Sequence, residues 1–205
     1  MMNAWLSIWL YVSAALGIVN LALLARHWDE WDGLKRLAPL AVTCLVLHVW
    51  EEWRIPGGFW YLYNSGVANY PMSQLTDMLT NFSGIVLGTI VVLYGANSIT
   101  SIVMLAISAM EAVVHGVLLR GKSEMLYGVS YNPGMVTALF GFLPLAVLFV
   151  VLLVRKKPKL RQVLLGILFA VIVNFSCVAL PEALLADPAS PYAFTDAGYY
   201  SSLVD

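Results

Sequence analysis

Long apolar runs, each about as long as a membrane-crossing helix, dominate the pattern of hydrophobic and polar positions along the chain. The hydrocarbon core of a bilayer is about 30 Å thick, which takes roughly 20 helical residues. Within lipid, an open-ended segment satisfies its backbone polar groups only as a helix. The pattern therefore predicts an all-α integral membrane bundle of six transmembrane helices, at about residues 4–25, 37–53, 79–96, 99–119, 134–154 and 162–180.

These runs predict one transmembrane domain over residues 1–180, followed by a tail over residues 181–205. The first run has no basic N-terminal region and no A-x-A cleavage site. It is also too long for the apolar region of a secretory signal, so we interpret it as a retained span.

The basic residues in the loops predict how the bundle is oriented in the cell membrane. With the N-terminus on the trans side, the inner loops 26–36, 97–98 and 155–161 contain eight Lys or Arg residues, and the outer loops contain three. Cytoplasmic loops of membrane proteins are enriched in these residues. The tail has three aspartates and no Lys or Arg, which agrees with a trans location. We therefore expect both termini on the trans side.

Composition narrows the functional classes. Apolar residues make up 60% of the chain and charged residues 11%, and the net charge is −1. Soluble domains have roughly 45–50% apolar and about 25% charged residues. These values exclude a soluble single domain, a disordered chain and a nucleic-acid binder. Cys44 and Cys177 form neither a C-x-x-C pair nor a zinc-binding spacing.

Two of the predicted spans contain ionisable residues that share one helix face. In the second span, Glu51 and Glu52 project to either side of His48, because successive helical residues are about 100° apart. In the fourth span, Glu111 and His115 are four residues apart and therefore lie on one face. Each of these two helices thus presents a histidine and at least one carboxylate.

Depth in the bilayer allows the two groups to meet. Glu52 and Glu111 lie about 22 Å and about 18 Å from the inner ends of their spans, in the outer half of the bilayer. Asp77 and Asn81, at the outer start of the third span, can enter the same layer and are secondary candidates. A single intramembrane histidine is usually structural, but a set of ionisable groups at this depth indicates a function.

The clustered carboxylates need a neutralising partner, and neither span has a Lys or Arg at this depth. One interpretation is a centre for one or two divalent metal ions. Imidazole and carboxylate ligands suit zinc, and also non-haem iron or manganese. Helical bundles hold di-metal sites through Glu-x-x-His pairs on facing helices. The expected metal ligands are His48, Glu52, Glu111 and His115.

The segment His48-x-x-Glu51-Glu52 parallels the H-x-x-E-H pattern, in which the outer residues bind zinc and the inner Glu is the base. Glu52 stands where the second histidine would be, so Glu51 is the expected base or an additional ligand. The expected catalytic residues are His48, Glu51, Glu52 and Glu111. A metal-bound water with a near-neutral pKa can attack an ester, an amide or an activated lipid, and iron with the same ligands can activate oxygen.

Two other functional classes are compatible with the same residues. Without a metal, a buried Glu as acid and a His–Glu pair as base would isomerise or cyclise an isoprenoid or sterol-like substrate, by analogy with emopamil-binding sterol isomerases. In an ion or small-solute transporter, the cluster would bind the ion, although the chain has no repeat or interrupted helix of that class. We favour the metalloenzyme. We expect a lipid-like substrate, because the loops are too short for a soluble binding domain.

Four motifs with a specific combined spacing run along spans two to five: His48-x-x-Glu51-Glu52, Pro56-Gly57-Gly58-Phe59, Glu111-x-x-x-His115 and Asn132-Pro133-Gly134. In these motifs the chain resembles the HXXEE-domain family, a set of small multi-span membrane proteins of uncharacterised function. The resemblance implies a shared site but no particular reaction. The residues that it implies are His48, Glu51, Glu52, Glu111 and His115.

Two segments outside the spans have alternative interpretations. Asn132-Pro133-Gly134 most simply begins the fifth span, with proline near the first helical position. Asn132 can also reach the site, and it is a secondary candidate. The aromatic tail over residues 181–205 either lies across the outer mouth of the bundle or is disordered.

Overall fold

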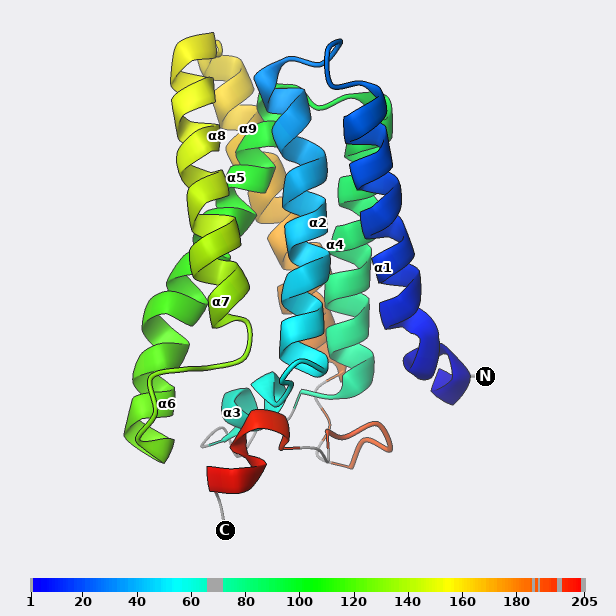
Figure 1. Ribbon diagram of the computed structural model, residues 1–205, viewed down its shortest axis with the longest axis vertical. Coiled ribbons are helices and arrows are strands. Elements are labelled where there is room, and N and C mark those ends of the chain that lie inside the picture. Colours follow the sequence, from blue (N-terminus) through cyan, green and yellow to red (C-terminus); the bar gives the residue numbers. More distant parts are fainter. Residues whose placement is uncertain (1, 66–71, 186, 188, 195–196, 204–205) are drawn as a thin grey trace.

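The computed structural model describes residues 2–65, 72–185, 187, 189–194 and 197–203. In this part of the chain, six helices are long and apolar enough to cross a membrane. The predicted all-α bundle of six spans is therefore confirmed (Figure 1). The six are α1 (Met2–Arg26), α2 (Gly33–Trp53), α4 (Gln74–Tyr94), and the continuous helices Ser98–Tyr127, Met135–Lys156 and Leu160–Leu185.

Each of the last three spans contains a short π-helical segment with an α-helical part on either side. Such segments are rare and often lie at functional sites. The divisions are α5 (Ser98–Val113), Val114–Leu119 and α6 (Arg120–Tyr127); α7 (Met135–Thr137), Ala138–Phe142 and α8 (Leu143–Lys156); and α9 (Leu160–Asn174), Phe175–Ala179 and α10 (Leu180–Leu185).

Two predicted loops contain helix, and there the expected boundaries are wrong. The fourth span continues as α6 to Tyr127, where Gly128 with a φ of 70° ends it. An ion pair of 3.1 Å between Arg120 and Glu124 lies on this extension, whose polar sequence gives no apolar signal. The loop predicted over residues 54–78 contains α3 (Phe59–Asn64) and the first turn of α4.

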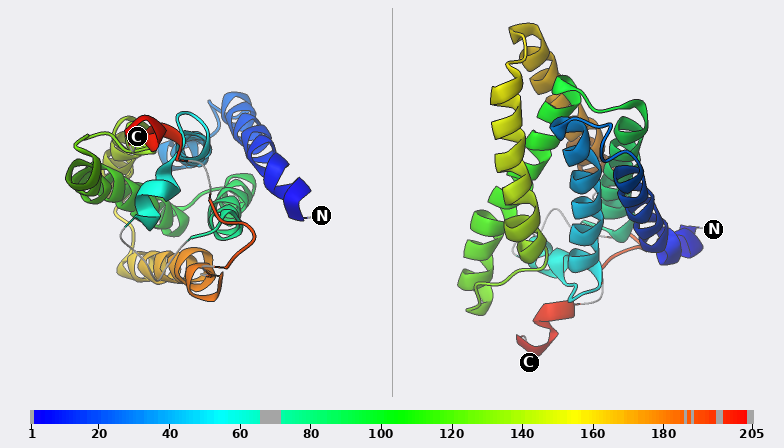
Figure 2. Two further views of the ribbon diagram at one scale, coloured as in Figure 1. Left: turned by 90° about the horizontal axis from the view of Figure 1, so that it is seen from below. Right: turned by 45° about the horizontal axis from the view of Figure 1, so that its top comes forward.

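The buried core lies between α2, α4, α5 and α8. Leu37, Val42, Ile85, Met104 and Phe149 are among its buried residues. Among the spans, α2 is the most buried and α9 the least. Seen from its end, the bundle has α9 at its edge (Figure 2). The buried polar residues of α2, His48, Glu51 and Glu52, therefore lie within the protein rather than against lipid.

The described part of the tail folds back over one end of the bundle. The backbone N–H of Gln74 donates to the carbonyl of Tyr192 at 2.8 Å, and that of Tyr199 donates to the carbonyl of Gly57 at 3.1 Å. Tyr200 is fully buried. Of the two alternatives for the tail, these residues therefore lie across the mouth. The start of α1 is at the same end of the bundle (Figure 1).

Candidate metal centre

Two neighbouring helices bring four donor atoms together, as the sequence predicts. The Nε2 atom of His48 lies 3.4 Å from Oε1 of Glu52 and 3.4 Å from Oε2 of Glu111. The Nε2 atom of His115 lies 3.3 Å and 3.8 Å from the same two oxygens. His48 and Glu52 lie in the last turns of α2, Glu111 lies in α5, and His115 lies in the π-helical segment that follows it.

This cluster is enclosed by protein. The side chains of His48, His115 and Glu52 are almost fully buried, whereas that of Glu111 is 18% exposed. The two imidazole rings meet edge to face, with their centroids 4.6 Å apart. Phe142 packs against the ring of His48, and Phe59 packs against that of His115. The donors thus lie in a low-dielectric pocket, where charge–charge interactions are strong.

Asn132 fixes the proton of the His115 ring. The Nδ2 group of Asn132 donates to the backbone carbonyl of His115 at 3.0 Å, so the amide oxygen faces the other way. That oxygen lies 2.8 Å from Nδ1 of His115, which must therefore carry the hydrogen. In the neutral ring, Nε2 then presents a lone pair to Glu52 and Glu111.

Thr137 fixes the position of the proton on the His48 ring. Its hydroxyl group lies 2.7 Å from Oε2 of Glu51 and 3.1 Å from the carbonyl of Gly134, both of which only accept hydrogen bonds when Glu51 is ionised. Thr137 Oγ1 therefore accepts from Nδ1 of His48, at 2.8 Å. In their neutral forms both imidazoles thus have the same tautomer, in which Nε2 can bind a cation.

Glu51 faces the segment before α8. One of its oxygens accepts hydrogen bonds from the Tyr131 hydroxyl and the Val136 N–H, both at 3.0 Å. The other accepts from the N–H of Thr137 at 2.9 Å, besides the Thr137 hydroxyl. Burial, and then the charge of Glu51, raises the pKa of Tyr131, so its phenol stays a donor at neutral pH. These four bonds occupy both oxygens of Glu51 and anchor the residues that orient His48.

The family described as "Protein of unknown function with HXXEE motif" matches residues 37–149, which is more than half of the chain. The chain belongs to the HXXEE family. The family resemblance of the sequence is thereby confirmed. No curated protein and no solved structure matches the chain.

The two glutamates of the HXXEE motif have different surroundings. Glu52 is directed toward the imidazoles of His48 and His115, whereas Glu51 is directed toward residues 131–137. In this geometry Glu51 lies beside the hydroxyl and amide groups that support the site. The sequence parallel with H-x-x-E-H does not distinguish these two directions.

Gly134 of this HXXEE protein has a role that the sequence analysis missed. It has a φ of 95°, and a Cβ placed on it would lie 2.4 Å from Cε1 of His115 and 2.8 Å from Cε1 of His48. Only glycine fits between the two rings in this backbone conformation. Thr137 was also missed. The signal for both was the Asn132-Pro133-Gly134 motif, in which only Asn132 was a secondary candidate for the site.

The secondary candidates have separate places in the HXXEE fold. Asn132 contacts His115, as described above. Asp77 and Asn81 both lie in α4, where the Asn81 amide donates to Asp77 at 2.6 Å. The Trp53 indole also donates to Asp77. Asp77 is therefore tied to the end of α2 through Trp53, and to its own helix through Asn81.

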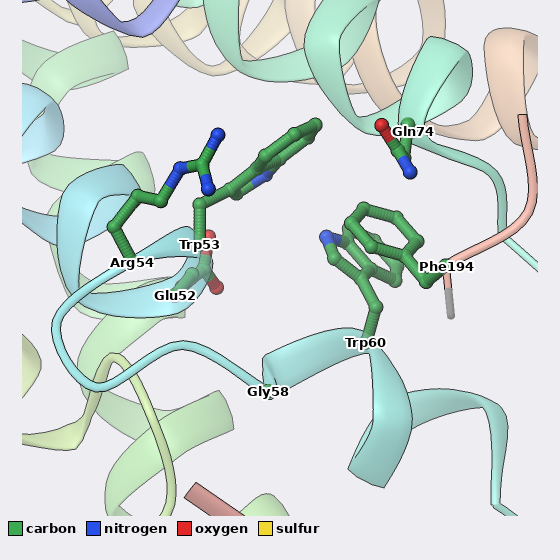
Figure 3. A pocket seen from close by; sticks show the side chains of 7 residues that line it. All are labelled: Glu52, Trp53, Arg54, Gly58, Trp60, Gln74 and Phe194. Atoms are coloured by element: carbon green, nitrogen blue, oxygen red, sulfur yellow. The ribbon is translucent and has the colours of Figure 1, made fainter. Parts of the chain in front are cut away.

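A pocket of about 120 Å³ reaches the centre from the end of the bundle that the tail covers. Figure 3 shows Glu52 on its wall, with the indoles of Trp53 and Trp60 on either side. Arg54 and Gln74 provide polar groups there, and Phe194 of the tail packs against Trp60 with ring centroids 5.7 Å apart. Glu52 therefore has access both to the imidazoles and to a space for small molecules.

Proposed function

We propose that this HXXEE protein is a membrane metalloenzyme that acts on a lipid-like substrate by hydrolysis or oxidation. The divalent metal would be held by His48, Glu52, Glu111 and His115. The observation that carries the proposal is the convergence of two imidazole nitrogens and two carboxylate oxygens. Each Nε2 atom lies 3.3–3.8 Å from both oxygens.

The distances between the donors support a metal rather than direct hydrogen bonds. An N–H···O bond spans about 2.7–3.2 Å, which is shorter than all four contacts. Ligand bonds of about 2.0–2.1 Å around zinc place neighbouring ligand atoms about 3.3–3.4 Å apart at the edges of a tetrahedron. Three of the contacts have that length, at 3.4, 3.4 and 3.3 Å. The ligand atoms of His48, Glu111 and His115 also all lie within 4.8 Å of one another.

Charge supports the same proposal. The two carboxylates of Glu52 and Glu111 with two neutral imidazoles have a net charge that one divalent cation balances. A neutral centre is what a site within a membrane span requires, because uncompensated charge there is costly. Two imidazoles with one or two carboxylates bind zinc, and two imidazoles with one carboxylate also bind non-haem iron.

The chemistry divides between the metal and the chain. A bound divalent metal acts as a Lewis acid and lowers the pKa of water. The chain orients its ligands through Asn132, Thr137 and Glu51, and it excludes bulk water by packing Phe59 and Phe142 against the imidazoles. Glu52 borders the pocket, so in this proposal it is the carboxylate that meets a substrate group. Glu51 is a positioning residue, in place of the base that the sequence pattern suggested.

Metal analysis tests the proposal directly. The protein is purified in detergent, loaded in turn with zinc, iron(II) or manganese, freed of excess ion and measured by elemental analysis. We expect about one ion per chain for at least one of these metals. His48→Ala and His115→Ala should lose it, because each removes a ligand. The matched control is His27→Ala, whose imidazole lies outside the spans and pairs with Glu30. Absence of all three metals from the wild-type protein would overturn the proposal.

The groups behind the ligands provide a second prediction. Asn132→Ala and Thr137→Val each remove the acceptor for the Nδ1 hydrogen of an imidazole. Loss of such a partner weakens metal affinity by roughly 10–100-fold. We expect this weakening in competition titrations with a chelating dye. Asn97→Ala, which removes the cap of α5 at the other end of the span, should leave the affinity unchanged. Equal affinities in all four proteins would contradict the assigned tautomers.

A further inference from the structure

A second, apolar cavity lies between α4, α5 and α9, on the inner side of the metal centre. Its volume is about 390 Å³, within the range of ligand pockets. Leu87, Val91, Val103 and Phe169 are among the apolar residues that form its wall. The polar groups at its far end are already satisfied, because Asn97 and Thr100 bond each other in the capping box of α5.

A smaller space of about 40 Å³ lies beside this cavity, on the side of the metal centre. Its wall shares Gly84, Gly88, Met104 and Ile107 with the larger cavity. It also includes Phe142, whose ring packs against His48 with the centroids 5.3 Å apart. The apolar space thus extends from Asn97 at the start of α5 to Phe142, one side chain away from His48.

Ser108 adds a polar group to the smaller space. It lines that space, is 1% exposed, and its hydroxyl has no hydrogen-bond partner. A buried hydroxyl without a partner costs free energy, which a ligand oxygen would recover. Ser108 lies one helical turn from Glu111, which has the most exposed side chain of the four donors. A ligand that bonds Ser108 would therefore have its polar end beside the metal centre.

We infer that this cavity binds one hydrocarbon chain of the substrate, with the polar end of the molecule between Ser108 and the metal centre. The inference rests on the proposed function for the identity of the reacting group. From Thr100 to Glu111 the helix rises about 16 Å. The site therefore fits a long, unbranched chain that runs along the helix, parallel to the lipid tails. The substrate class is thus a single-chain amphiphile or one chain of a membrane lipid.

Photolabelling tests the inference. The probe is a long-chain fatty alcohol with a diazirine at mid-chain, added to the detergent-purified protein, and the labelled residues are mapped by mass spectrometry. We expect labelling of residues 97–107 and 84–91, and loss of that labelling when unlabelled fatty alcohol is in excess. Val103→Trp fills the cavity and should reduce labelling by roughly tenfold. Ala106→Trp, on the exposed face of the same helix, is the matched control.

Further variants separate this inference from the proposed function. Val173→Trp fills the cavity from α9, in case Val103→Trp does not fold. Ser108→Ala should weaken competition by a fatty alcohol about threefold to tenfold, and leave competition by the alkane of equal length unchanged. His115→Ala should lose metal but keep the labelling. Labelling that persists in both tryptophan variants would overturn the inference. So would labelling spread over all lipid-exposed residues rather than concentrated at the cavity. Specific labelling of a wild-type protein that takes up none of the three metals would support the cavity and remove only the metalloenzyme.

Discussion

Gly134→Ala is expected to abolish metal binding, although residue 134 is not a ligand. The added Cβ would lie 2.4 Å from Cε1 and 2.6 Å from Nδ1 of His115, and 2.8 Å from Cε1 of His48. Both rings would have to move, and with them the two Nε2 atoms. Overpacking of this kind costs about 1–3 kcal/mol. A left-handed backbone costs a residue with a Cβ about 1–2 kcal/mol more. Elemental analysis and thermal unfolding in detergent measure the two effects.

The control for this prediction is Gly128→Ala. Gly128 also has a positive φ, of 70°, but among the described residues no atom beyond its chain neighbours lies within 4 Å of the position of its Cβ. It therefore has the backbone cost without the clash. We expect a smaller loss of thermal stability and unchanged metal content. If Gly134→Ala binds metal like the wild-type protein, Gly134 does not set the distance between the imidazoles.

The fold could be predicted from hydrophobic length alone, because lipid allows few alternatives to a helix for an apolar run. The boundaries failed where the helix continues in polar sequence. In α6, Arg120, Lys122 and Glu124 hide the helical extension from any apolar pattern. The ion pair of Arg120 and the contact of the Lys122 ammonium with the Tyr63 carbonyl, at 2.8 Å, depend on neighbours that sequence distance does not reveal.

The four proposed ligands could be found from the sequence because helical periodicity decides which residues share a face. Of the residues that support them, the sequence indicated Asn132 only as a secondary candidate and did not indicate Thr137. Asn132 and Thr137 reach the imidazoles only because residues 131–137 return to the end of α2, which is a tertiary contact. The contact of residues 131–137 with the end of α2 also determines why Glu51 and Glu52 have different roles. On one helix they are neighbours with equal chemistry, and only the packing partner of each side chain separates their roles.

Because Glu51 and Glu52 have different packing partners, substitution by Gln should have different effects on stability at the two positions. Glu51→Gln should destabilise the metal-free protein by about 2–3 kcal/mol, since the new amide directs two donors at groups that are themselves donors. Whichever oxygen becomes the amide nitrogen, it faces one backbone N–H and one hydroxyl. These are the N–H of Val136 and the hydroxyl of Tyr131, or the N–H and the hydroxyl of Thr137. Glu52→Gln should leave the stability of the metal-free protein equal or higher. It removes one of two like charges that lie beside the same imidazoles.

The two variants should rank in the opposite order when metal content is measured instead of stability. Glu52→Gln replaces a charged ligand with a neutral one and should lose the ion, whereas Glu51→Gln should retain part of the affinity because all four proposed ligands remain. Thermal unfolding of chelator-treated protein, followed by circular dichroism, and elemental analysis of loaded protein provide the two measurements. A Glu52→Gln protein that keeps its metal, beside a stable Glu51→Gln protein that loses it, would exchange the two roles. The first glutamate of the motif would then be the ligand, and the hydrogen bonds from residues 131–137 would have to yield to the ion.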